Sequence, residues 1–218
     1  MPPNPGLITK LTDKYRKGLL SHFIYERVRN SLAKVGLRIS LCIVFEERPL
    51  GGAAPTAALA DCRLGLLSEA DMPELAAVEG YGYSTADLVT RLKNRSLCVA
   101  FRHQEKIVAF TWCDTENCRH KILPVELSEN EAFLYDDHTA KAYRGKDLIV
   151  LVRHRAYEEL EKIDRFRFLS TSDFFNKPAI RFKKKLHAVP LQLVFYICLF
   201  NKIEKKFDLK EYKPRSLR

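Results

Sequence analysis

One stretch of the chain combines carboxylates and an imidazole with the pattern of a β-strand. Residues 131–139 read EAFLYDDHT, in which apolar residues give way to titratable ones toward the end. A carboxylate or an imidazole beside a bound substrate can accept a proton and so act as a general base. We expect the base here, with Asp136 and His138 as the first candidates and Glu131 as a further one.

The side chains of a strand alternate between its two faces. Asp136 and His138 are therefore expected on one face, and Tyr135 and Asp137 on the other. Only one pair can face a substrate, and we favour Asp136 and His138. Taken singly, each of these residues also fits an ordinary hydrogen-bonded role at the end of a strand.

A basic turn follows the strand, and a helical pattern follows the turn. The turn is Arg144, Gly145 and Lys146, and the helix is expected at about Asp147–Ile163. The first turn of a helix has N–H groups without intrahelical partners and carries the positive end of the helix dipole. A phosphate or pyrophosphate group can bind at such a position.

The elements around this candidate site predict an α/β domain. Strand and helix patterns mix hairpins with a crossover connection, so we expect a mixed sheet flanked by helices. The expected strands are Cys62–Leu67, Leu97–Phe101, Lys106–Trp112, Ala132–Thr139, Phe166–Ser170 and Leu191–Phe200. One helix is expected to begin after Ser68, and the others are expected at Ser84–Asn94, Asp147–Ile163 and Pro178–His187.

An extension precedes this domain. Apolar residues recur at helical spacing over Tyr15–Val35, with basic residues mostly off that stripe, and a strand pattern follows at Leu37–Phe45. We expect the stripe to pack on the protein's own core, with a membrane surface or a partner as alternatives. Arg48–Ala60, rich in Gly, Ala and Pro, is the expected linker. The expected domains are 1–60, the extension, 61–200, the main domain, and 201–218, a basic C-terminal tail.

The run Ala132–Lys146 resembles the fourth strand and phosphate loop of the GNAT acyltransferase superfamily, and Asn176–Phe182 is similar to the helix start after that family's fifth strand. The resemblance covers about residues 62–200. It implies a central twisted mixed sheet flanked by helices. It also implies transfer of an acyl group from acetyl-CoA or another acyl-CoA to a primary amine that attacks the thioester directly.

The family's positions imply how the donor is bound. Its pantetheine arm pairs with strand backbone around Asp137–Thr139, where a backbone N–H meets the thioester carbonyl. The acceptor amine must lose a proton first, because an ammonium with a pKa of about 10.4 is not nucleophilic. The implied donor-binding residues are Asp137, Thr139, Arg144, Gly145, Lys146, Asp147, Leu148, Ile149 and Asn176.

The phosphate loop departs from the family pattern. Asp147 and Ile149 stand where small residues are expected after Arg144, which obstructs close approach of the phosphates and adds a negative charge. Three interpretations stay open. Asp147 caps the helix and CoA binds unconventionally; the donor is an acyl carrier protein, with one phosphate and an acidic surface; or the protein is an inactive binding module.

The general acid is not assigned. Many members of the family use a tyrosine at the position that Lys183 occupies here. A lysine could stabilise the leaving thiolate, although Lys183–Lys185 also fits a solvated basic face. Tyr143 is a weak substitute.

The net charge of +10 lies at the two ends, since residues 1–60 carry 9 basic and 4 acidic side chains and residues 176–218 carry 12 and 3. Such ends attract acidic or phosphate-rich partners, among them an acidic carrier protein and an anionic membrane surface. A non-catalytic protein that binds nucleic acid or a membrane is the rival class. No nucleic-acid-binding motif accompanies the charge, so nucleic acid is not the expected partner.

The six cysteines lie mostly in apolar runs, as free thiols of a cytosolic protein do. Cys113, Cys118 and His120 lack the second ligand pair typical of zinc sites, so no metal is expected. No apolar run reaches the length of a transmembrane helix, and the N-terminus does not resemble a secretory signal. We expect a cytoplasmic protein, with peripheral membrane binding as the alternative.

Overall fold

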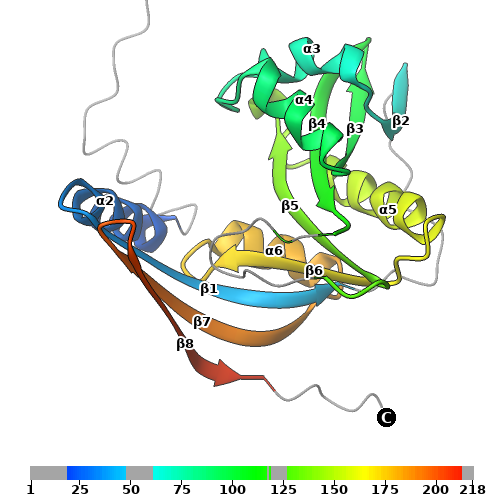
Figure 1. Cartoon of the computed structure of the whole chain (residues 1–218). Coiled ribbons are helices and arrows are strands. Elements are labelled where there is room, and N and C mark those ends of the chain that lie inside the picture. Colours follow the sequence, from blue (N-terminus) through cyan, green and yellow to red (C-terminus); the bar gives the residue numbers. More distant parts are fainter. Residues whose placement is uncertain (1–18, 48–60, 117, 119–126, 213–218) are drawn as a thin grey trace, which may run out of the picture. The chain divides into compact units, whose positions relative to one another are not determined.

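The computed structural model describes residues 19–47, 61–116, 118 and 127–212 (Figure 1). The helices are α2 Leu20–Lys34, α3 Met72–Ala76, α4 Thr85–Lys93, α5 Leu148–Glu161 and α6 Lys177–Lys185, with 3-10 turns at Glu69–Asp71 and Lys141–Tyr143. The strands are β1 Leu37–Glu47, β2 Cys62–Leu66, β3 Leu97–His103, β4 Lys106–Asp114, β5 Glu131–Thr139, β6 Arg167–Asp173, β7 Val189–Leu199 and β8 Ile203–Glu211. The expected linker Arg48–Ala60 and His120 lie outside the described residues.

These strands form a mixed sheet in the order β2-β3-β4-β5-β6-β1-β7-β8. Strands β2 to β5 pair antiparallel, β5 and β6 pair parallel, and β7 and β8 pair antiparallel. The expected α/β class, a mixed sheet flanked by helices, is confirmed. The chain divides into two compact units, one of residues 46–170 and the other of residues 1–45 with 171–218.

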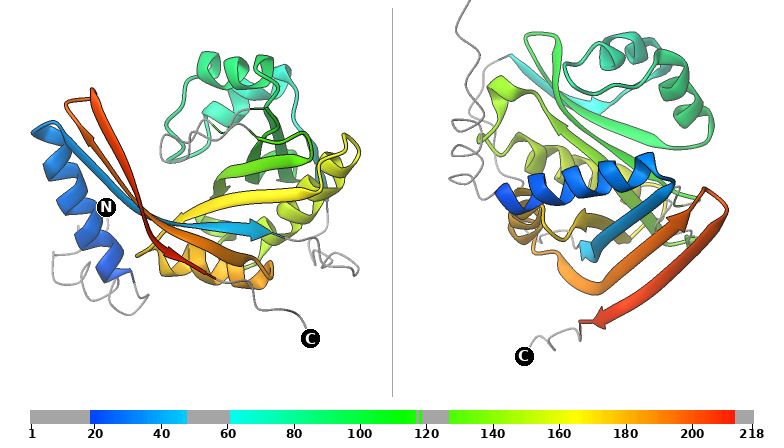
Figure 2. Two further views of the ribbon diagram at one scale, coloured as in Figure 1. Left: turned by 60° about the horizontal axis from the view of Figure 1, so that its bottom comes forward. Right: turned by 90° about the vertical axis from the view of Figure 1, so that its left-hand side faces the viewer.

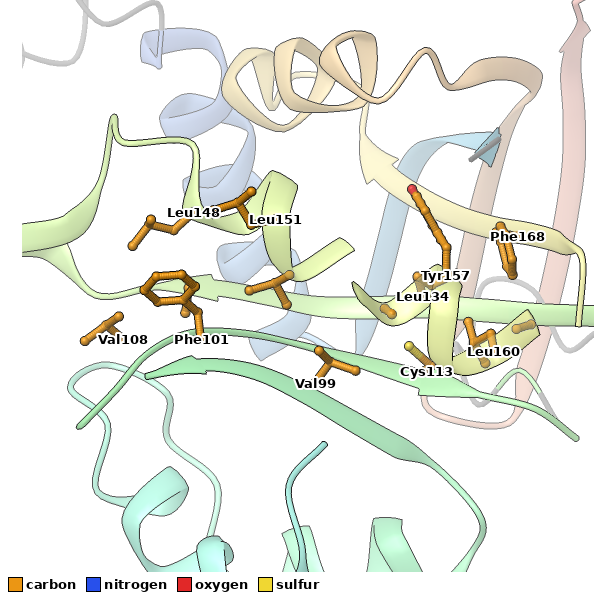
Figure 3. Close-up of a cluster of buried hydrophobic side chains, with 14 residues drawn as sticks. Val99, Phe101, Val108, Cys113, Leu134, Leu148, Leu151, Tyr157, Leu160 and Phe168 are labelled. Atoms are coloured by element: carbon orange, nitrogen blue, oxygen red, sulfur yellow. The ribbon is translucent and has the colours of Figure 1, made fainter. Parts of the chain in front are cut away.

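The 46–170 unit has helices on both faces of its strands. Helix α5 packs against one face, where Leu148, Leu151 and Leu160 join side chains from β3, β4 and β5 (Figure 3). Helices α3 and α4 cover the other face, where Leu75 and Leu88 pack against Phe110. Strand β3 contributes alternate residues to the two clusters, as a strand buried on both sides must.

Side-chain caps fix the starts of the short helices on this second face. Ser84 and Asp87 form a capping box at the start of α4, in which Asp87 N–H donates to the Ser84 hydroxyl at 3.2 Å. Ser68 and Asp71 form a second box before α3. Each box supplies partners for N–H groups that a helix start leaves unpaired. The helix starts expected at Ser68 and Ser84 are confirmed.

Strand β5 changes partners along its length. Its first part, Glu131–Leu134, pairs with Arg167–Ser170 of β6, and the parallel register stops there. Its second part continues beside β4 as far as the pair Ala109 and Thr139. The titratable end of β5 therefore has strand neighbours on one side only among the paired residues.

The other compact unit holds helix α2 against residues near β1 and β6. The Tyr25 hydroxyl accepts the Leu41 N–H at 2.8 Å, and Arg29 pairs with Asp173 at 3.4 Å. The apolar stripe faces elsewhere, because Ile24 and Val28 are exposed. The expectation that the whole stripe packs on the protein's own core is therefore wrong, since an aromatic and charged face makes the contact instead.

Two further expectations change in this unit. Residues 203–211, within the expected C-terminal tail, form strand β8 and pair with β7. The many lysines of this segment obscure its strand pattern in the sequence. A strand at the edge of a sheet tolerates such charged residues. Lys183, read with Lys184 and Lys185 as a solvated basic face, is only 1% exposed.

Candidate active site

A β-bulge lies at the centre of the candidate site. Phe110 pairs with His138 and Trp112 pairs with Tyr135, so Thr111 alone stands opposite both Asp136 and Asp137. Asp136 takes the left-handed conformation, with φ of 50°. A bulge of this kind bends the strand and changes the direction of the side chains beside it.

The bulge breaks the simple alternation expected for this strand. Tyr135 and Asp136 both reach Arg91 on helix α4, whereas Asp137 pairs with Arg153 on helix α5. Asp136 and His138 do lie on one side, as expected. Tyr135 is the error, because the extra residue places it on the same side as Asp136 rather than with Asp137.

Arg91 joins Asp136 to a group of aromatic rings. Its guanidinium donates to Asp136 at 2.6 Å and to the Tyr81 hydroxyl at 3.2 Å. The guanidinium carbon also lies 4.1 Å from the ring centre of Tyr83 and 5.2 Å from that of Trp112. Burial alone would lower the pKa of Arg91, but the bond to Asp136 raises it above its usual value. Arg91 is therefore a fixed positive charge, and nothing in the local sequence pattern had marked it.

His138 is placed to work as a neutral base. Its ring stacks on Phe110 with centroids 5.2 Å apart and lies 6.0 Å from Tyr81. Burial, with the positive charge of Arg144, lowers the pKa of His138 below its usual value. The buried Nε2 atom has no hydrogen-bond partner among the described residues. A neutral imidazole with an unused nitrogen can accept a proton.

The turn between β5 and α5 presents backbone N–H groups. Gly145 has a φ of 82° and Asp147 a φ of 54°, and the Val150 N–H donates to the Asp147 carbonyl as the helix begins. The amides of residues 145–149 precede that first bond, and residues 144–147 are exposed. Such amides can bind an anion at the positive end of the helix dipole.

The side chains of this turn modify that anion site. Arg144 is held by its Nε–H bond of 3.0 Å to the Thr139 carbonyl, and Lys146 Nζ lies 5.4 Å from the ring centre of Tyr143. Asp147 occupies the N-cap position, but its side chain makes no capping hydrogen bond. Ile149 packs against the core cluster under α5. Of the three interpretations of the loop, the one in which the Asp147 carboxylate caps the helix is therefore wrong, because the left-handed backbone at this residue is not the extended form that a capping side chain needs.

Asp137 is the partly exposed end of a charge network on the α5 face that is otherwise buried. Arg153, fully buried, donates to Asp137 at 2.6 Å and lies 3.5 Å from the Glu47 carboxylate. The hydroxyls of Tyr157 and Ser170 donate to Glu47. No local sequence pattern indicates this network, because its members are far apart along the chain.

Glu131 does not join the candidate base pair. It lies at the start of β5, pairs with Arg167, and its carboxylate accepts the Ser128 N–H at 3.0 Å. A strand rises by about 3.3 Å per residue, so Glu131 is roughly 17 Å from Asp136. The structure thus brings together Asp136 and His138 but not Glu131.

The remaining expected site residues have other settings. Asn176 caps helix α6 by accepting the Ala179 N–H at 3.2 Å, in the unit of residues 1–45 and 171–218. The Tyr143 hydroxyl forms a hydrogen bond of 2.9 Å with His103 Nδ1. Cys113 and Cys118 are both buried, and the described residues contain no cluster suited to a metal ion.

The fold is that of the GNAT acetyltransferases. Solved structures with this fold include a GNAT-family acetyltransferase of Novosphingobium aromaticivorans, with a TM-score of 0.52 and 16% identity over 75% of this chain, and a tandem GNAT protein of the clavulanic acid biosynthesis pathway, with a TM-score of 0.56 and 12% identity over 78%. These matches span 66% and 57% of the two proteins, less than two thirds of either. A GCN5-related N-acetyltransferase of Kribbella flavida matches with a TM-score of 0.50, 16% identity, and coverage of 74% of this chain and 59% of its own.

No protein-family model matches the sequence, and a search of curated proteins finds no significant relative. Identities this low establish the fold alone.

Proposed function

We propose that the protein is an N-acyltransferase that moves an acyl group from a thioester donor to a primary amine. The observation that carries the proposal is the β5 bulge, with a neutral His138 beside it, leading directly into the amide-rich turn before α5. A base and an anion site at the two ends of one short segment are what such a reaction needs. The shared fold supports the same reaction class.

In this proposal the turn binds the donor's phosphates. Arg144 and Lys146 supply charge, and the amides of residues 145–149 supply hydrogen bonds. The backbone of Asp137–Thr139, which lies beyond the last residue of β5 that pairs with β6, pairs with the pantetheine arm, and one of its N–H groups polarises the thioester carbonyl. The donor is acetyl-CoA or another acyl-CoA.

His138 then accepts a proton from the acceptor's ammonium group, directly or through a water molecule. The free amine attacks the thioester carbon and a C–N bond forms. The C–S bond then breaks, and the departing thiolate takes up the second proton that the nitrogen loses, so the donor leaves as a thiol. Asp136 attracts the ammonium group electrostatically, since its carboxylate is partly exposed beside Arg91.

An acyl carrier protein is the second candidate donor. Asp147 favours a carrier-protein donor. This exposed carboxylate stands at the start of α5, and it repels the two phosphates of a pyrophosphate more strongly than a single phosphate. The basic side chains of the same turn suit the acidic surface of a carrier protein.

Donor binding and turnover test the proposal separately. Calorimetry with CoA, acetyl-CoA and an acylated carrier protein measures binding, and release of free thiol in the presence of primary amines measures transfer. We expect Arg144→Ala to weaken donor binding about tenfold, while Arg63→Ala, an exposed arginine on β2, leaves it unchanged. Binding without thiol release for any amine would mean an inactive binding module, and no binding of any donor would overturn the proposal.

A further inference from the structure

Helix α2 turns its apolar stripe away from the rest of its unit. Ile24, Val28 and Val35 are 54%, 49% and 66% exposed, although they recur on one side of the helix. The adjacent side of the helix makes the contacts, through Tyr25 and Arg29, which each follow a stripe residue by one position. A helix of a globular protein normally buries such a stripe. An exposed apolar face of this kind indicates a binding surface.

Phe200 extends this stripe from the turn between β7 and β8. Its N–H donates to the Gly36 carbonyl at 2.6 Å, and its ring covers Gly36, where an added Cβ would lie 2.4 Å from a ring carbon. Gly36 directly follows Val35, so the Phe200 ring lies next to the end of the α2 stripe. Figure 2 shows the turn between β7 and β8 beside the end of α2. The ring is nevertheless 64% exposed.

The backbone at Phe200 is unfavourable for an aromatic residue. Phe200 and Asn201 have φ values of 51° and 57°. These are left-handed values, such as the two central residues of a type I′ hairpin turn adopt. Glycine, asparagine and aspartate are the residues that such positions favour, and a bulky side chain there is strained. An exposed aromatic ring that is held in a strained turn points to a use for the ring itself.

Cationic side chains surround these apolar residues. Arg27 and Lys34 flank the stripe on α2, and Arg38 and Lys202 lie beside the Gly36 and Phe200 turns, all of them exposed. Residues 33–38 and 199–205 together carry four basic side chains and one acidic, Glu204. We use the name basic apolar face for eight residues: the apolar Ile24, Val28, Val35 and Phe200, and the cationic Arg27, Lys34, Arg38 and Lys202.

We propose that the basic apolar face binds an anionic lipid surface. Aliphatic and aromatic side chains can enter the boundary between headgroups and acyl chains, while arginines and lysines at their edge pair with lipid phosphates. None of the described helices is long and apolar enough to cross a bilayer, so this attachment is peripheral. The surface belongs to the unit of residues 1–45 and 171–218, and none of its residues takes part in the candidate active site.

Two other occupants fit the surface less well. A second copy of the chain would bring like charges together at the same face, which opposes association. Nucleic acid would use the cations, but it offers no apolar environment for Ile24, Val28 and Val35. Lipid phosphates above acyl chains match both parts of the surface.

Vesicle flotation tests the proposal with the full chain. We expect binding to phosphatidylcholine vesicles that contain about one-third phosphatidylglycerol, weak binding to phosphatidylcholine alone, and release at high salt. Phe200→Asn should weaken vesicle binding at least about tenfold, because the variant has no aromatic ring at this position to enter the lipid. The same variant should melt at an equal or higher temperature, since asparagine suits the turn.

Phe166→Asn is the matched control, because Phe166 is 57% exposed and lies in the 46–170 unit. It should leave lipid binding unchanged. Lys34→Gln combined with Lys202→Gln should remove the preference for anionic vesicles. Equal binding of wild type and Phe200→Asn would overturn the proposal. So would concentration-dependent self-association that Phe200→Asn abolishes in a protein that binds no vesicles, which would identify a second copy as the occupant.

Discussion

Arg153 of helix α5 donates a hydrogen bond of 2.6 Å to Asp137 of strand β5, immediately after the bulge. Arg153 also lies 3.5 Å from Glu47, which is itself fully buried. This pair ties the helix of the proposed donor site to the strand of the proposed base. Although burial by itself would lower the pKa of Arg153, Asp137 and Glu47 raise it, so the guanidinium stays charged.

Arg153→Met should destabilise the protein strongly. Removing one partner from a buried ionic network leaves Asp137 and Glu47 without their cation, which typically costs about 3–5 kcal/mol. Chemical denaturation measures the change in the free energy of unfolding. Arg155→Met is the control, since Arg155 lies on the same helix but is partly exposed and pairs with Glu158 and Glu159. Equal effects of the two substitutions would contradict a special role for Arg153.

Arg91→Lys should separate acceptor binding from donor binding. Lysine keeps the charge but loses the planar group that bonds Asp136 while lying over Tyr83 and Trp112. We expect KM for the acceptor amine to rise about tenfold with donor affinity unchanged. Arg95→Lys, at an exposed arginine just after α4, should change neither. A loss of donor affinity in Arg91→Lys would show that the Arg91 cluster supports the donor site instead.

Protonation of His138 should affect both the reaction rate and the free energy of unfolding, so both should depend on pH. The pKa of His138 is lowered in the folded protein, so a rate that requires neutral His138 should persist below the usual histidine pKa of about 6.5 and fall only at lower pH. In the unfolded chain the same group takes up a proton at about pH 6.5. The free energy of unfolding should therefore decline as pH falls below about 6.5, until the folded-state pKa is passed.

His138→Gln should remove the acidic limb of the kcat/KM profile and reduce the decline in stability. His154 also has a pKa lowered by burial and should contribute to the decline, but not to the rate. His187→Gln, at an exposed histidine after α6, serves as the control. A kcat/KM profile that keeps the same acidic limb in His138→Gln would exclude His138 as the base.

The elements that position the site could be predicted because their signals are local. Capping residues such as Ser84 and the apolar period of α5 depend only on neighbours within a few turns. The strand-turn-helix segment at residues 131–161 was predicted on the same grounds, and the structure places it in the expected order.

The finer site geometry depends on partners that are distant in sequence. The bulge at Asp136 depends on how β5 pairs with Thr111, and Arg153 acquires its role only when Glu47 is buried beside it. The direction of the α2 stripe likewise depends on the hydrogen bond between the Leu41 N–H and the Tyr25 hydroxyl, and not on the helical period. Periodicity identifies an apolar face but does not say whether the protein itself covers it.

Asp147→Asn tests whether this residue restricts the donor. Asparagine tolerates the left-handed backbone at Asp147, so the fold of the turn should be kept while the negative charge at the start of α5 is removed. A charge at a helix terminus is worth about 0.3–1 kcal/mol, so CoA should bind roughly two- to fivefold more tightly by calorimetry. A carrier-protein donor, with one phosphate, should gain less. Asp164→Asn is the matched control, because Asp164 is also left-handed, with φ of 59°, but follows the other end of α5. Weaker binding of CoA by Asp147→Asn would mean that the carboxylate helps to hold the donor, as a hydrogen-bond acceptor for its hydroxyl or amide groups, rather than opposing its phosphates.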